Sequence, residues 1–138
     1  MNAFNQNPRD SVLIIGTLDT KPDELAFLRD CVVEGGGRAV LMDVGVREQT
    51  RFAADITNRD VAAAAGLTLE EIGASADENA AMQAMTRGAI VQTRNAFDEG
   101  RVRGVLVLGG TMGTDLALDV TAALPVGVPK FLISTVSF

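Results

Sequence analysis

Residues 106–115 read LVLGGTMGTD and join an apolar run to a loop rich in glycine and threonine. The run Gly104–Leu108 (GVLVL) is apolar throughout, which is typical of a strand buried on both faces of a parallel sheet. Three glycines and two threonines follow within residues 109–114, just before a helix expected from about Thr114 to Leu124. The stretch therefore predicts one strand–loop–helix unit of an α/β protein.

The same alternation of strand and helix recurs along the chain. Pro22 lies near the start of a first helix, and the three glycines at 35–37 end it. Shorter helices are expected over 59–65 and 67–73, and a long one over 77–99. The pattern predicts a Rossmann-like doubly wound parallel sheet of about four strands, ordered 2-1-3-4, with helices on both faces. The other strands are predicted at Val12–Gly16, Ala39–Val44 and Lys130–Val136.

Composition narrows the classes of function. The 138 residues have a formal charge of −6, which disfavours a nucleic-acid binder because such proteins cluster Lys and Arg to displace counterions. Histidine is absent, so the chain itself cannot supply a Ser-His-Asp or Cys-His mechanism. A single cysteine fits a reducing compartment, and we find no secretory signal or membrane span. We therefore expect a cytoplasmic protein that does not enter membranes.

The two ends of the chain differ from its middle. Residues 1–10 (MNAFNQNPRD) are polar and are expected to form a flexible arm, whereas 11–138 are expected to form a single nucleotide-binding subdomain. The last predicted strand runs toward Phe138 with no helix after it, so the subdomain reads as truncated at its C-terminus. An uncovered strand would leave apolar surface exposed, which predicts a homo-oligomer.

Two polar loops, GTLDTK at 16–21 and GGTMGT at 109–114, follow the first and third predicted strands. In a sheet ordered 2-1-3-4 these strands are neighbours, and the chain leaves them in opposite directions. Open α/β sheets bind ligands in the crevice at such a switch point, outside the carboxyl ends of the strands. We therefore expect the two loops to meet over one ligand.

The loop GGTMGT has the features of an anion site. Glycine can adopt φ > 0 and lets a ligand approach the backbone, and the amides of the loop and of the helix N-terminus can donate to an anion. Thr111 and Thr114 can add hydroxyl groups. The loop matches neither of the common phosphate-loop fingerprints. The alternative is that Gly109 and Gly110 only turn the chain while Thr114 caps the helix.

The loop GTLDTK adds charged groups. Lys21 can meet a phosphate as a point charge, and Asp19 can bind Mg²⁺, which prefers one or two carboxylates together with ligand oxygens. The alternative makes Asp19 or Thr20 the cap of the next helix and Lys21 a solvated side chain. Asp43 ends the second strand, where dinucleotide folds place an acid that holds ribose hydroxyls; a turn residue is the equal alternative.

Other side chains are assigned by their position in the pattern. Ser134 and Thr135, at the end of the fourth strand, are expected to line the same crevice. Cys31 and the pair Met82 and Met85 are expected in the core. The full set of predicted ligand-binding residues is Thr17, Asp19, Thr20, Lys21, Asp43, Gly109, Gly110, Thr111, Gly113, Thr114, Ser134 and Thr135, with Asp19 as the candidate metal ligand.

Four stretches in combination, GTLDTKPDELAFLRD, LMDVGV, GVLVLGGTMGT and LPVGVPKFLISTV, resemble the UPF0261 family, also called the Tm-1-like ATP-binding family. The similarity is spread over nearly the whole chain. It implies ATP binding, and it implies an N-terminal Rossmann-like subdomain that is followed in the parent chain by a second α/β subdomain. By the same resemblance, the motif loops of the ATP site would be Thr17, Asp19, Thr20, Lys21 and Gly109 to Thr114.

Three functions are compatible with these residues. The first is the nucleotide-binding half of a larger protein, with ATP, alone or with Mg²⁺, held by the two loops. The second is part of an enzyme that acts on a small acid or a phosphorylated metabolite, with Asp19, Lys21 and Asp43 as candidate site residues. The third is an interaction or dimerisation module in which the glycine loops are structural and 77–99 forms the partner surface.

Overall fold

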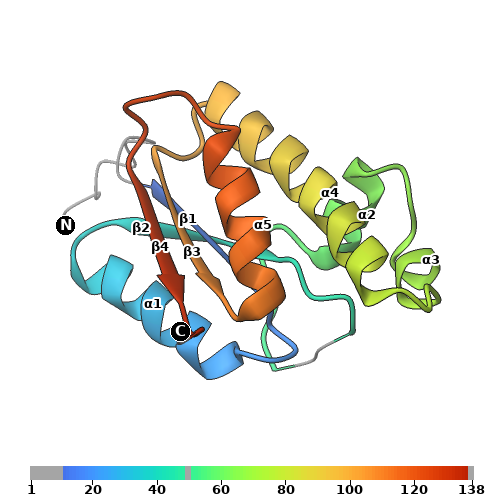
Figure 1. Ribbon diagram of the computed structural model, residues 1–138. Helices are drawn as coiled ribbons and strands as arrows, with labels where there is room; N and C mark the ends of the chain where they lie inside the picture. The colour runs from blue at the N-terminus through green and yellow to red at the C-terminus, as the bar shows by residue number, and fades with distance from the viewer. Residues whose placement is uncertain (1–10, 49–50, 137–138) are drawn as a thin grey trace.

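The computed structural model describes residues 11–48 and 51–136, so the expected arm at 1–10 lies outside the described residues. Within that range four strands alternate with five helices (Figure 1). The strands are β1 (Ser11–Gly16), β2 (Arg38–Asp43), β3 (Gly104–Gly109) and β4 (Lys130–Ser134). The helices are α1 (Pro22–Glu34), α2 (Asn58–Ala64), α3 (Leu69–Gly73), α4 (Glu78–Asp98) and α5 (Thr111–Ala122).

The strands form one parallel sheet in the order β2-β1-β3-β4, as the sequence predicts. Ile14 of β1 lies opposite Leu41 of β2 and Leu106 of β3. Leu13, Ile14 and Ile15 are fully buried, because strands flank β1 on both sides and helices cover both faces of the sheet. The α/β Rossmann-like class is confirmed.

The helices divide between the two faces of the sheet (Figure 1). On one face α1 packs through Leu25 into the smaller of two apolar clusters. On the other face α4 and α5 lie side by side over the larger cluster, and α2 packs on α4. A Cβ on Gly88 of α4 would lie 1.9 Å from the carbonyl oxygen of Val61 in α2. Gly88 therefore allows α4 and α2 to pack closely at this point.

The start of α5 and the caps of α5 and α1 differ from the sequence-based alternatives, whereas α1 starts at Pro22 as predicted. Helix α5 begins at Thr111 rather than Thr114, and its N-cap is Gly110, which has no side chain to cap it. Thr114 therefore lies inside the first turn, where its hydroxyl donates to the Gly110 carbonyl oxygen at 2.6 Å. The N-cap of α1 is Lys21, so neither Asp19 nor Thr20 caps that helix, and the capping alternatives are wrong.

The expectation that Cys31 lies in the core is wrong, because this side chain is exposed. Leu25, Leu28 and Val32 mark the face of α1 that packs on the sheet. Cys31 lies at the margin of that face, since successive helical residues are rotated by about 100°. Met85 is fully buried as predicted. None of the helices in the described part of the chain combines the length and the apolar character needed to cross a bilayer.

Candidate functional site

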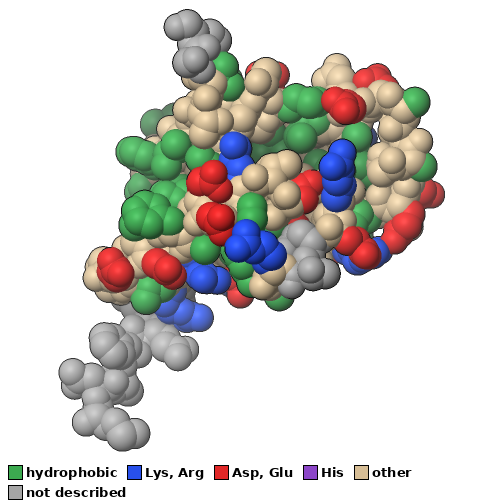
Figure 2. All heavy atoms as spheres, turned by 90° about the horizontal axis from the view of Figure 1, so that it is seen from below, with side chains coloured by type: hydrophobic (Ala, Val, Ile, Leu, Met, Phe, Trp, Pro, Cys, Tyr) green, Lys and Arg blue, Asp and Glu red, His purple; other side chains and the backbone are tan. Residues whose placement is uncertain are grey.

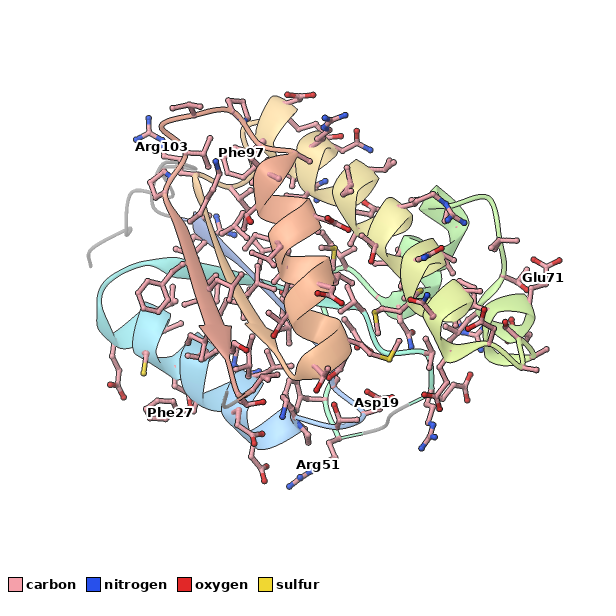
Figure 3. The ribbon with its side chains drawn as sticks, in the orientation of Figure 1. Asp19, Phe27, Arg51, Glu71, Phe97 and Arg103 are labelled. Atoms are coloured by element: carbon pink, nitrogen blue, oxygen red, sulfur yellow. The ribbon has the colours of Figure 1, made fainter. Side chains whose placement is uncertain are left out.

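The loops after β1 and β3 meet at the carboxyl edge of the sheet and line one cavity of about 390 Å³. They meet because β1 and β3 are direct neighbours, with Ile15 opposite Val107. Figure 3 shows Asp19 at this edge, near the first turn of α5. The predicted residues that line the cavity are Thr17, Asp19, Thr20, Lys21, Gly109, Gly110, Thr111 and Gly113.

The three glycines of GGTMGT have three different surroundings. A Cβ on Gly109 would lie 2.3 Å from the carbonyl carbon of Gly113, so Gly109 lets α5 approach the end of β3. A Cβ on Gly110 would have ordinary contacts only, at 3.8 Å or more, and a Cβ on Gly113 would meet nothing within 4 Å. No glycine of this loop has a positive φ, so the loop does not use that freedom of glycine.

The first turn of α5 lines the cavity, and its first backbone amides have no acceptor within the helix. The Thr114 amide donates to the Gly110 carbonyl oxygen at 2.8 Å, which closes the first helical hydrogen bond. The amides of residues 111–113 precede it and have no acceptor within the helix. Gly110, Thr111, Met112 and Gly113 all line the cavity, which places this amide group at its wall.

The β1–α1 loop is a tight turn that brings Lys21 to the same place. The Thr17 carbonyl oxygen accepts from the amides of Thr20 at 3.3 Å and Lys21 at 2.9 Å, and the hydroxyls of Thr17 and Thr20 are hydrogen-bonded to each other. The Lys21 Cε atom lies 3.9 Å from the position that a Cβ would take on Gly110. The cation of one loop therefore lies beside the N-cap of the helix that follows the other.

Asp43 is buried behind this edge and does not line the cavity. Its Oδ1 accepts from the amide of Leu18 at 3.1 Å and from that of Gly45 at 2.9 Å. Burial raises the pKa of the Asp43 carboxyl above its ordinary value; the amides of Gly45 and Leu18 oppose that shift and the charge of Asp19 adds to it. Asp43 thus holds the loops after β1 and β2 together, and its proposed contact with ribose stays a prediction.

Asp19 offers an acceptor that the rest of the described chain leaves unused. Its Oδ1 is buried and has no hydrogen-bond partner among the described residues. A Cβ on Gly45 would lie 2.7 Å from this atom and 3.0 Å from Asp43 Oδ1, so the two carboxylates face the same glycine. No cluster of three or more His, Cys, Asp or Glu side chains suited to a metal occurs within 11–48 and 51–136. The donors therefore fit Mg²⁺ only if the ligand supplies further oxygens.

Thr114, Ser134 and Thr135 lie at the same edge but do not line the cavity. The hydroxyls of Thr114 and Ser134 lie 2.8 Å apart, and the Thr135 amide donates to the Gly109 carbonyl oxygen at 2.9 Å. These contacts tie the end of β4 to the glycine loop. The role of the three side chains as ligand contacts stays a prediction.

The loop after β2 is also part of the site, although none of its residues is among those predicted from the sequence. Gly45, Val46 and Arg47 line the cavity beside Met82 and Met112. The rule that identified the other two loops would have found this one, because β2 ends at the same edge of the sheet. Figure 2, which views the molecule from this edge, shows Lys and Arg side chains interspersed with Asp and Glu.

Asn58, at the start of α2, holds the loop after β2 in place. Its side-chain Nδ2 donates to the carbonyl oxygens of Gly45 at 2.9 Å and Arg47 at 3.0 Å. Asn58 is buried, so these two bonds satisfy an amide that would otherwise be costly to bury.

Comparison with known proteins places the chain among relatives of greater length. A UPF0261 protein of Brucella suis biovar 1 is 44% identical over 138 residues, which is 100% of this chain and 32% of that protein. A UPF0261 protein of Clostridium tetani is 32% identical over 126 residues, 91% of this chain and 31% of that protein. The ToMV resistance protein Tm-1(GCR237) of Solanum lycopersicum is 34% identical over 150 residues, 98% of this chain and 20% of that protein.

The chain thus spans about a third of the length of these bacterial relatives. A family model described as the uncharacterised protein family (UPF0261) N-terminal domain matches residues 10–138. The chain therefore belongs to the UPF0261 family.

Proposed function

We propose that this chain binds ATP at the carboxyl edge of its sheet, with the phosphates between the β1–α1 loop and the first turn of α5. The position of Lys21 close to Gly110, at the wall of the same cavity, supports this most strongly. It sets a cation beside the amides at the positive end of the α5 dipole, so two independent attractions act on the same anion. The cavity volume of about 390 Å³ also lies within the range of small-molecule sites.

Gly113 provides a separate argument for a ligand. Glycine within a helix destabilises it by roughly 0.5–1 kcal/mol relative to alanine. Gly109 has a structural reason to be glycine, because a side chain there would collide with the backbone of α5. Within the described part of the chain nothing excludes a Cβ at Gly113, yet this residue lines the cavity. Its missing side chain leaves room for a ligand, which the interaction-module alternative does not explain.

Magnesium fits the proposal through Asp19. Asp19 Oδ1, which has no hydrogen-bond partner among the described residues, is a suitable oxygen ligand, and the phosphates of ATP would complete the coordination. When bound, Mg²⁺ would neutralise part of the triphosphate charge. Lys21 and the α5 amides would position the phosphates.

Isothermal titration with ATP, with equimolar Mg²⁺, tests the proposal. Lys21→Gln should weaken binding about 10–100-fold, since a hydrogen bond to a charged group contributes roughly 1.5–3 kcal/mol. Lys130→Gln is the matched control: it makes the same charge change at the opposite edge of the sheet, where Lys130 donates to the Pro125 carbonyl oxygen at 3.1 Å. It should leave the affinity unchanged within about twofold.

The proposal fails if the folded chain and the longer Brucella suis relative both bind no ATP, with folding checked by circular dichroism. It also fails if Lys21→Gln and Lys130→Gln weaken binding equally. Running the longer protein in parallel separates a wrong proposal from a site that needs more of the polypeptide.

A further inference from the structure

The cavity at the sheet edge borders a groove between α4 and α5. This groove, of about 330 Å³, shares Met82, Met112 and Leu116 with the cavity. The two helices lie side by side on one face of the sheet, with the first turn of α5 at the carboxyl edge (Figure 1). A ligand with its phosphates at Lys21 can therefore extend past the two methionines into the groove.

The groove walls have helical spacing. Asn79, Gln83 and Thr86 lie along one face of α4, at intervals of three or four residues. Asp115 and Asp119, four residues apart, lie along the facing side of α5. Thr86 is already engaged, because its hydroxyl donates to the Met82 carbonyl oxygen at 2.8 Å.

The two ends of the combined site differ in charge. Lys21 and Arg47 line the cavity at the sheet edge. The groove, by contrast, contains two carboxylates, and none of its described lining residues is Lys or Arg. A triphosphate is repelled there, whereas a flat ring with N–H donors can give hydrogen bonds to carboxylates and amide oxygens.

We propose that the α4–α5 groove binds the nucleobase of the nucleotide, with Met82 and Met112 packed against the ring. This inference rests on the proposed ATP site and adds its orientation, with phosphates toward Lys21 and base toward Asp115. Methionine suits this position because its flexible, polarizable thioether makes favourable contacts with aromatic rings.

The test compares ATP with inorganic tripolyphosphate, which has the same phosphate chain and no base. The informative variant is Met112→Ala, because Met82 also packs on the core and its truncation risks the fold. Val91→Ala, on α4 and outside both cavities, is the control for removal of an exposed apolar group. Asp115→Ala is paired with Asp98→Ala, an exposed carboxylate of the same helix pair.

We expect Met112→Ala to weaken ATP binding about tenfold, from the lost burial of a methionine, and to leave tripolyphosphate binding unchanged. Asp115→Ala should likewise weaken ATP alone, while both controls bind both ligands like the wild type. Equal affinity of the wild-type chain for ATP and tripolyphosphate overturns this inference and leaves the proposed phosphate site standing. The same holds if Met112→Ala changes both affinities alike. If neither this chain nor the longer Brucella suis relative binds either ligand, both proposals are overturned.

Discussion

Replacing Gly113 with alanine should stabilise the fold and weaken ATP binding at the same time. A Cβ at this position meets no atom of residues 11–48 and 51–136 within 4 Å, and Gly113 lies in the first turn of α5 with an ordinary helical backbone. Alanine should therefore gain roughly 0.5–1 kcal/mol of stability, which raises the melting temperature of a chain of this size by about 2–4 °C. The new methyl group would occupy the cavity, and overpacking of this kind costs about 1–3 kcal/mol, or roughly 5–100-fold in affinity.

Gly109→Ala is the counterpart with the opposite effect on stability. Its Cβ would lie 2.3 Å from the carbonyl carbon of Gly113 and 2.6 Å from the Thr114 amide nitrogen, so α5 must shift. Thermal unfolding followed by circular dichroism measures stability, and titration with ATP measures binding. If Gly113→Ala is more stable and binds ATP like the wild type, no ligand approaches this turn and the reasoning is refuted. If Gly109→Ala is as stable as the wild type, the close approach of helix and strand is wrong.

Three further predictions concern the carboxylates and the loop after β2. Burial raises the folded-state pKa of Asp43 above the ordinary value of 3.8. Between these two pKa values the folded chain holds a proton that the unfolded chain has lost. The free energy of unfolding therefore falls, through this group, as the pH rises above 3.8. Urea denaturation of the wild type from about pH 4 to 7, without divalent cations, should show this fall in the free energy of unfolding. The fall should be smaller in Asp43→Asn, whose side-chain oxygen can still accept from the amides of Leu18 and Gly45. Asn58→Ala should lose about 1–3 kcal/mol of stability and also bind ATP more weakly, because it removes both bonds to the loop containing Gly45 and Arg47. EDTA should weaken ATP binding to the wild type more than to Asp19→Asn; an equal effect in titrations of both would remove Asp19 as a magnesium ligand.

The fold was predictable because each element has a local signal. The buried runs of β1 and β3 contain few polar residues, which is typical of strands in a parallel sheet. Helix α1 ends at Glu34, directly before the glycines at 35–37, as the sequence predicts. The start of α5 was missed because threonine is a common cap, whereas the structure uses Gly110 and lets Gly109 bring the helix close. Cys31 is predicted in the core but is exposed, because a small difference in helix rotation decides whether a residue at the margin of a helix face is buried.

The candidate site was predictable only where strand order decides it. The topological rule brings Lys21 and Gly110 together from positions far apart in the sequence. The rule gives no information on side chains from neighbouring helices, so Met82 could be assigned only to the core. Its second role at the cavity depends on how closely α4 packs on α5, which tertiary contacts determine.

Charge favours the magnesium complex over free ATP at the proposed site. Lys21 and Arg47 line the cavity, but Asp19 does too, and Asp43 lies close behind it in a chain of net charge −6. Two unit charges about 4 Å apart interact by roughly 4 kcal/mol near a protein surface. Repulsion between Asp19 and a phosphate beside it would therefore cancel about as much binding free energy as Lys21 or Arg47 contributes. A divalent ion between them turns that repulsion into attraction. The same ion would give Asp19 Oδ1 the partner that it lacks among the described residues, and a buried oxygen without one is costly. Asp19 and Lys21 line the same cavity, so an acceptor of Asp19 that is open among the described residues supports the proposal that ATP binds together with a cation.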